Sequence, residues 1–282
     1  MNGFFYVAIG SKYHQEALKS VRSLKAHNPS ANVTLFTEKV INEPEFDRIV
    51  GIDIASGSFE KIIAFHLVDY KKAVFLDTDT YIVDDISDLF QILDNFDFAA
   101  SLEVARGYWY REHEPNLPDA FPELNSGVIA FKNSSKTKNF FKEWEFYFEE
   151  SKAWQLKVKS WELKRDVLST RIWDQPSLRK ALYFSKDIRH TSLPTEYNAL
   201  RMNGTYLWGK AKIIHGRGNI EEVVRRMNKN VDIERSFFQG FGVIADFSRI
   251  SFKDVIKTVL RINACAILCF KDKILNAIFR HK

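Results

Sequence analysis

Residues 73–80 read Ala-Val-Phe-Leu-Asp-Thr-Asp-Thr, a short apolar run that ends in two acidic residues. Four consecutive apolar residues bounded by polar ones are typical of a strand that is buried on both faces. Open α/β sheets bind ligands in a crevice at the carboxyl ends of such strands. Asp77 and Asp79 lie at that end, where their carboxylates can share one divalent ion. The segment therefore predicts an α/β sheet with a metal site at its edge.

The sequence before this run alternates between strand and helix patterns. The expected strands are residues 4–10, 33–37 and 49–54, and the expected helices are residues 11–26 and 59–70. Asn28 and Pro29 end the first helix before the second strand begins. Alternation of this kind predicts a Rossmann-like, mostly parallel central sheet flanked by helices.

The pattern after residue 80 is less regular. The expected elements are a short helix at 85–95, strands at 98–102 and 128–131, helices at 137–154 and 174–182, and a late strand at 212–215. Residues 103–123 contain three prolines and no sustained period, so we expect a long loop beside the site.

Length and charge suggest one catalytic unit with an appendage. A chain of 282 residues that is 45% hydrophobic can bury one sizeable core, so we expect a catalytic domain at 1–242 and a helical segment at 243–282. The net charge is +5, and residues 251–282 hold seven Lys or Arg against two Asp. A nucleic-acid-binding domain usually spreads its basic residues over a binding face, so we expect no nucleic-acid partner.

The basic segment at 251–282 reads as amphipathic helices, and two placements are open for it. Its apolar run at 264–270 is far shorter than the ~20 residues that span a bilayer. The helices either dock on the catalytic domain or lie on an anionic membrane surface. The first ten residues lack the pattern of a signal peptide, so we expect a cytoplasmic protein, peripheral at the inner face of a membrane in the second case.

Four segments, taken in order, resemble those of one family. They are Phe75-Leu76-Asp77-Thr78-Asp79-Thr80, Leu124-Asn125-Ser126-Gly127-Val128, Asp174-Gln175-Pro176 and His215-Gly216. The chain is similar to the GT-A glycosyltransferases over about residues 4–218. The resemblance is greatest to the glycogenin-like family, of the family eight type, which includes bacterial lipooligosaccharide galactosyltransferases. It implies a GT-A fold and transfer of a sugar, with retained configuration, from a nucleotide diphosphate donor to a saccharide or lipid-linked acceptor.

The resemblance also implies a metal centre and a catalytic pair. Asp77, Asp79 and His215 would hold the ion, with Asp77 also counted among the donor-binding residues. Oxygen ligands suit Mg or Mn, and the added imidazole favours Mn. Asp174 and Gln175 would lie beneath the anomeric carbon and stabilise positive charge there.

Five further residues would bind the donor if the family's roles apply. Tyr13 would stack on the base, most often uracil in this family, and Lys61 would approach the phosphates or the sugar. Asn125 and Ser126 would hydrogen-bond to the sugar. Arg217 would meet the departing phosphate, although relatives usually carry a lysine a few residues beyond the histidine.

Simpler roles are open for several of these residues. Asp77 and Asp79 could cap a turn, and Asp174 could cap a helix. Asn125 could serve a tight turn before a glycine, and His215 could be a structural hydrogen-bonding residue.

Two other functions are also open. One is a haloacid-dehalogenase-like phosphatase with Asp77 as its nucleophile, although Tyr81 stands where that pattern has Thr or Val. The other is a nucleotide-sugar-binding protein without catalytic activity.

Overall fold

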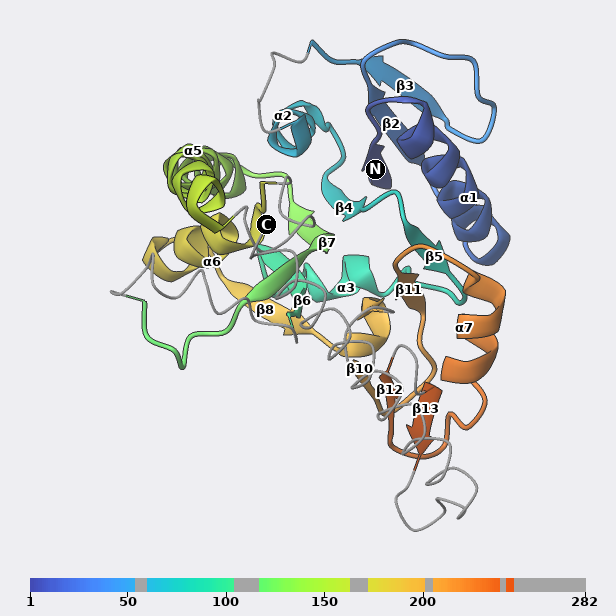
Figure 1. The fold of residues 1–282 in the computed structure, drawn as a ribbon. Coiled ribbons are helices and arrows are strands. Elements are labelled where there is room, and N and C mark those ends of the chain that lie inside the picture. The colour runs from blue at the N-terminus through green and yellow to red at the C-terminus, as the bar shows by residue number, and fades with distance from the viewer. Residues whose placement is uncertain (54–59, 104–116, 163–171, 201–204, 239–241, 246–282) are drawn as a thin grey trace, which may run out of the picture.

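The computed structural model describes residues 1–53, 60–103, 117–162, 172–200, 205–238 and 242–245 (Figure 1). A seven-stranded sheet in the order β3-β2-β1-β4-β7-β6-β8 forms its centre. Its strands are β1 (Asn2–Val7), β2 (Val33–Thr37), β3 (Arg48–Gly51), β4 (Lys72–Leu76), β6 (Phe98–Leu102), β7 (Leu124–Lys132) and β8 (His190–Leu193). Strand β7 is antiparallel to β4 and β6, whereas the other pairs are parallel. The expected mostly parallel α/β sheet is confirmed.

Helices cover both faces of this sheet. They are α1 (Ser11–His27) and the single-turn α3 (Leu89–Ile92) on one face, and α2 (Glu60–Leu67), α5 (Ser135–Glu162) and α6 (Gln175–Phe184) on the other (Figure 1). Neighbouring strand residues point to opposite faces, so Phe5 packs with the second group and Phe4 with the first. Strands buried on both faces are mostly apolar, which explains the short apolar runs in the sequence.

Aromatic packing fixes helix α2 against the sheet. The Phe65 ring stacks on Phe131 with centroids 5.2 Å apart and meets the edge of Phe141 at 4.9 Å. Residues four apart lie on the same side of a helix, so this packing also directs Lys61 toward the sheet. The Lys61 ammonium lies 4.7 Å from the centre of the Phe75 ring, near the end of β4.

Two small sheets follow at the carboxyl end of the central strands. One has the order β5-β11-β9, from Thr80–Ile82, Ile213–His215 and Ala199–Leu200. The other has the order β10-β12-β13, from Thr205–Leu207, Arg235–Phe238 and Gly242–Ala245. Helix α7 (Ile220–Met227) and the 3-10 turn η1 (Thr195–Tyr197) complete this region. The pairing of Thr80 with His215 brings the two ends of the expected site together.

Several expected boundaries differ from those of the structure. The short helix is a single turn at Leu89–Ile92 rather than 85–95, and β7 begins at Leu124 rather than at 128. Asn125 is therefore a strand residue, and the tight-turn alternative for it is wrong. Strand β13 includes residues on both sides of the expected domain boundary between 242 and 243, and the division into two parts stays a prediction. Most of the long loop at 103–123 and all of 251–282 lie outside the described residues.

Among the helices that the structure describes, none is both long and apolar enough to cross a membrane.

Candidate metal and donor site

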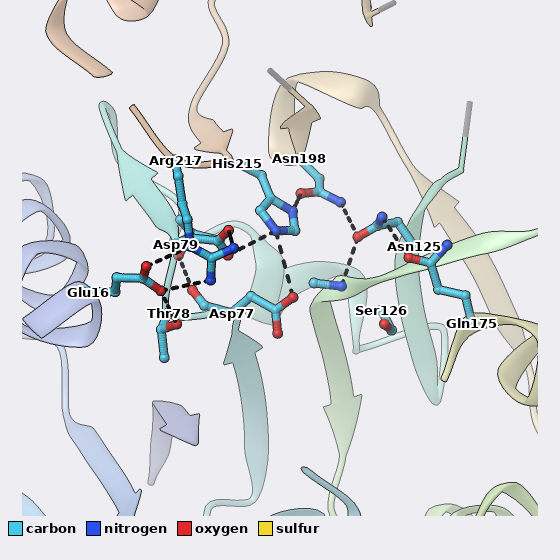
Figure 2. A network of polar contacts seen from close by, with 12 residues as sticks. Glu16, Asp77, Thr78, Asp79, Asn125, Ser126, Gln175, Asn198, His215 and Arg217 are labelled. Atoms are coloured by element: carbon cyan, nitrogen blue, oxygen red, sulfur yellow. Dashed lines mark hydrogen bonds and ion pairs between the residues drawn. The ribbon is translucent and has the colours of Figure 1, made fainter. Parts of the chain in front are cut away.

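Two aspartates and a histidine converge at the carboxyl end of β4 (Figure 2). The Asp77 amide donates to the carbonyl of Gly127, and the Gly216 amide donates to the carbonyl of Asp79. These backbone bonds hold His215 Nε2 at 3.2 Å from Asp79 Oδ1 and 3.7 Å from Asp77 Oδ2. One ligand atom from each residue lies within 4.8 Å of the others. Two carboxylates and an imidazole at this spacing fit one divalent cation of the Mn or Mg kind.

Burial and neighbouring charges shift the pKa values of two of these residues. Burial raises the pKa of Asp79, but the hydrogen bond and charge of His215, with the charge of Arg217, lower it to about 2. Burial lowers the pKa of His215, yet the hydrogen bond and charge of Asp79 and the charge of Asp77 raise it above its ordinary value. A protonated His215 would offset part of the charge of the two acids, and a divalent cation would take the place of its proton.

A glycine makes room for the histidine ring. A Cβ atom on Gly127 would lie 2.2 Å from Cε1 and 2.7 Å from Nδ1 of His215. No side-chain carbon tolerates such an approach, so β7 needs glycine where the imidazole crosses it. Gly127 belongs to the segment 124–128 singled out in the sequence, but this steric role cannot be read from that segment.

Amide and carboxylate side chains form a second, buried cluster beside the metal residues. Asn125 Nδ2 donates to Glu103 Oε2 at 2.7 Å and to Gln175 Oε1 at 3.1 Å. Gln175 Nε2 donates to Glu103 Oε2 at 2.9 Å and to Glu123 Oε1 at 3.3 Å. Asn125 Oδ1 accepts from the side chain of Asn198, which also contacts His215. Neither glutamate nor Asn198 was predicted as a site residue, because none belongs to a recognised motif.

Lys61 contacts residues of the site from a helix end, a strand and the end of a second strand. Its ammonium donates to Asp174 Oδ2 and to the carbonyl of Ser126, each at 3.0 Å, and lies 3.4 Å from Asp77 Oδ1. Asp174 occupies the N-cap position of α6, but its side chain makes no capping hydrogen bond. The alternative in which this carboxylate serves as a helix cap is therefore wrong.

A cleft of about 330 Å³ runs along the two aspartates of the candidate metal site. Tyr13, Lys61 and Arg217 line it together with Asp77 and Asp79. The cleft thus brings together residues expected to contact a base, phosphates and a metal ion. Asn125 and Gln175 are more deeply buried, with 4% and 8% of their surface exposed.

Arg217 is held over the cleft by an acid that the sequence analysis missed. Its Nε and Nη2 donate to the two carboxylate oxygens of Glu16, at 2.6 and 2.9 Å. Nη1 lies 3.5 Å from Asp79 Oδ2, and the guanidinium carbon lies 5.8 Å from the centre of the Tyr13 ring. The positive φ angles of Gly216 and Gly218, 125° and 122°, allow the turns on either side of this arginine.

The chain is similar in sequence and in fold to known proteins. The sequence profile of the family described as nucleotide-diphospho-sugar transferase matches residues 68–215. Glycogenin-1 of the rabbit, Oryctolagus cuniculus, is 26% identical over 159 aligned residues. That alignment covers 48% of this chain and 43% of the rabbit protein, so the chain matches less than half the length of this relative.

Two solved structures share the fold. The galactosyltransferase LgtC in complex with donor and acceptor sugar analogs aligns with a TM-score of 0.51 at 15% identity, over 77% of this chain and 87% of that one. The WbbM bifunctional glycosyltransferase aligns with a TM-score of 0.50 at 16% identity, over 77% of this chain and 46% of that one. At these identities the likeness concerns the fold alone.

Proposed function

Because this chain belongs to the nucleotide-diphospho-sugar transferase family, and its fold is of the GT-A type, we propose that it transfers a sugar from a UDP-linked donor. The transfer uses Mn²⁺ or Mg²⁺, and the acceptor is a saccharide or a lipid-linked saccharide. One observation carries the proposal: Asp77, Asp79 and His215 converge beside a cleft that Tyr13 and Arg217 also line. Family membership also favours glycosyl transfer over the phosphatase alternative.

The residues around the cleft match the parts of such a donor. The Tyr13 ring is 36% exposed and can stack on a base, while the cations of Arg217 and Lys61 flank the acids where phosphates would lie. A divalent cation bound to Asp77, Asp79 and His215 supplies positive charge that offsets the charge of the departing diphosphate. Arg217 can add a hydrogen-bonded guanidinium fork on the same leaving group.

We place the sugar between the cleft and the buried amide cluster. The Asp174 carboxylate and the Gln175 amide follow each other at the start of α6, and Asn125 lies on the adjacent strand β7. Asp174 can stabilise the positive charge that develops at the anomeric carbon. Retention of configuration then requires no covalent nucleophile, because the acceptor attacks on the leaving-group side and a diphosphate oxygen takes its proton.

A panel of nucleotide sugars tests this function. Each compound is added with and without Mn²⁺, and thermal stabilisation and slow donor hydrolysis are measured, since a ligand that binds only the folded state raises its stability. We expect one or a few UDP-sugars to stabilise the protein only when Mn²⁺ is present and to be hydrolysed slowly. Stabilisation without any turnover, with or without saccharide acceptors, would instead indicate a non-catalytic binding protein. If no nucleotide sugar stabilises the protein, the proposed function is wrong.

A further inference from the structure

Asn198 is a buried amide that lies between the metal histidine and the amide cluster. It follows η1 and precedes β9, and only 3% of its surface is exposed. Its Oδ1 lies 2.8 Å from His215 Nδ1, and its Nδ2 lies 2.8 Å from Asn125 Oδ1 (Figure 2). No motif in the sequence includes this residue, and the proposed function does not use it.

One backbone amide, that of Gly127, fixes which atoms donate and which accept in the hydrogen bonds that connect Asn125, Asn198 and His215. The Gly127 N–H can only donate, and it lies 2.8 Å from Asn125 Oδ1. Asn125 Oδ1 is therefore an acceptor, so the group of Asn198 that faces it is the NH₂. The carbonyl oxygen of Asn198 then faces His215, whose Nδ1 must carry the hydrogen. In the neutral imidazole this leaves the lone pair on Nε2, the nitrogen that faces Asp79 and Asp77.

The backbone fixes Asn198 in this position. Strand β9 runs parallel to β11 and pairs Leu200 with His215, so Asn198 directly precedes the strand that neighbours the histidine. The backbone N–H of Asn198 also donates to the carbonyl of Thr195 at 3.0 Å, which closes the turn before β9. The side chain therefore reaches the ring from a segment with two independent backbone restraints.

We propose that Asn198 is a positioning residue that holds His215 with Nε2 directed at the two aspartates and links this ring to Asn125. The inference rests on the proposed function, because it takes the metal site as its target. Hydrogen-bonding partners of this kind fix the tautomer and orientation of a metal-binding histidine, and their loss typically weakens metal binding about 10- to 100-fold. The link to Asn125 also joins the metal site to the place assigned to the donor sugar.

Binding of Mn²⁺ alone, followed by electron paramagnetic resonance of the free ion, tests the role without any turnover. We expect Asn198→Leu, which has a similar shape and no polar atoms, to weaken Mn²⁺ binding about 10- to 100-fold. Asn198→Asp keeps an oxygen for the Nδ1 hydrogen but loses the donor to Asn125. It should bind Mn²⁺ within about threefold of the wild type and bind UDP-sugars less tightly in the presence of Mn²⁺.

A matched control separates positioning from a general loss of stability. Asn28 is also a buried asparagine, 7% exposed, with side-chain bonds to Leu24, Asp84 and Ile86, and it contacts no residue of the site. Asn28→Leu should destabilise the fold while its Mn²⁺ affinity stays at the wild-type value. Equal weakening in Asn28→Leu and Asn198→Leu, or in Asn198→Asp and Asn198→Leu, would overturn the assignment.

The same titrations distinguish this inference from the proposed function. If the wild type binds Mn²⁺ and Asp79→Ala does not, the metal site is established independently of Asn198. Wild-type Mn²⁺ affinity in Asn198→Leu would then overturn the positioning role alone. If the wild type itself binds no Mn²⁺, the metal site of the proposed function fails and the positioning role fails with it.

Discussion

The candidate site has a charged half and an amide half, and the two are built differently. The charged half holds Asp77, Asp79 and Arg217, whose side chains are 24%, 16% and 43% exposed and are held by ion pairs. The amide half holds Asn125 and Asn198, which are 4% and 3% exposed and make directed hydrogen bonds. Ion pairs that are open to solvent can change partners at little cost in free energy. A buried polar group that loses its hydrogen-bond partner costs about 1–3 kcal/mol of stability. We infer that the charged half rearranges around a ligand and the amide half holds its geometry.

Removal of one acid from the charged half should have the largest effect on metal binding. Asp79→Ala takes away a proposed metal ligand and the carboxylate that lies 3.2 Å from His215 Nε2. We expect Mn²⁺ binding, and with it Mn²⁺-dependent donor binding, to fall by more than roughly 100-fold, because the loss of a ligand exceeds the cost of losing its supporting residues. Titration with Mn²⁺ measures the first quantity, and thermal stabilisation by UDP measures the second.

A surface aspartate provides the control for this substitution. Asp84 pairs with Lys210 at 3.1 Å and lies outside the site, so Asp84→Ala should leave Mn²⁺ affinity unchanged. The circular dichroism spectrum of Asp79→Ala should match that of the wild type, because the carboxylate packs at the edge of the sheet and not in the core. Wild-type Mn²⁺ affinity in a folded Asp79→Ala variant would remove the metal assignment.

A methyl group placed between the two halves should disturb both. In Gly127→Ala the new Cβ would meet His215 Cε1 at 2.2 Å and Asn125 Oδ1 at 2.9 Å, so the ring and the amide must move. We expect a loss of about 1–3 kcal/mol in stability from overpacking. We also expect about 10- to 100-fold weaker Mn²⁺ binding from the displaced histidine. Thermal unfolding and Mn²⁺ titration measure the two losses.

Gly209→Ala is the matched control, because a Cβ on Gly209 would meet nothing within 4 Å. It should change neither quantity. Unchanged Mn²⁺ affinity in Gly127→Ala would show that the ring and the strand are not in the close contact described above.

The two halves also differ in how far the sequence predicts them. Asp77 and Asp79 follow a short apolar run in a sequence that alternates between strand and helix patterns, so the local sequence places them at the end of a buried strand. Asn198 lies between a 3-10 turn and a two-residue strand, and its partners are 73 and 17 residues away in sequence. Strands of two or three residues have no detectable period, and their pairing depends on contacts distant in sequence. The central sheet without its edge strand β8 and the motif residues could therefore be predicted, whereas β5, β8, β9, β10 and the supporting hydrogen bonds could not.

A rise in pH should have opposite effects on two properties of the charged half. It should lower the stability of the metal-free protein and raise the affinity for Mn²⁺. The pKa of His215 is raised in the folded protein, so its charged form stabilises the metal-free protein fully below the unfolded pKa of about 6.5. That contribution is lost as the pH rises through the folded pKa. A metal ion requires the neutral ring, so Mn²⁺ affinity should increase over the same window, by at most about tenfold per pH unit for one proton.

Thermal unfolding from pH 6 to 8.5, with and without Mn²⁺, measures both trends. His215→Gln should remove the slopes that belong to this residue, so the difference between wild type and variant isolates them. His190→Gln serves as the control, because the pKa of His190 is lowered by burial and its ring lies outside the metal site. If the stabilisation by Mn²⁺ does not grow with pH in the wild type, His215 does not exchange a proton for a metal ion.

Lys61 lies where the two halves meet. Removal of its charge should have the smallest effect, and it should change the affinities for Mn²⁺ and for the donor in opposite directions. Its ammonium lies 3.4 Å from Asp77 and 3.0 Å from Asp174, so it competes electrostatically with a cation. Lys61→Met keeps the packing over Phe75 and removes the charge. Mn²⁺ alone should then bind about three- to tenfold more tightly, while UDP with saturating Mn²⁺ should bind several-fold less tightly because an anion loses a nearby cation.

Lys25→Met, which breaks the surface pair with Asp47 at 3.0 Å, should change neither affinity. If Lys61→Met weakens Mn²⁺ and UDP alike, the lysine holds the architecture of the site, and the charged half is less free to rearrange than the ion pairs indicate.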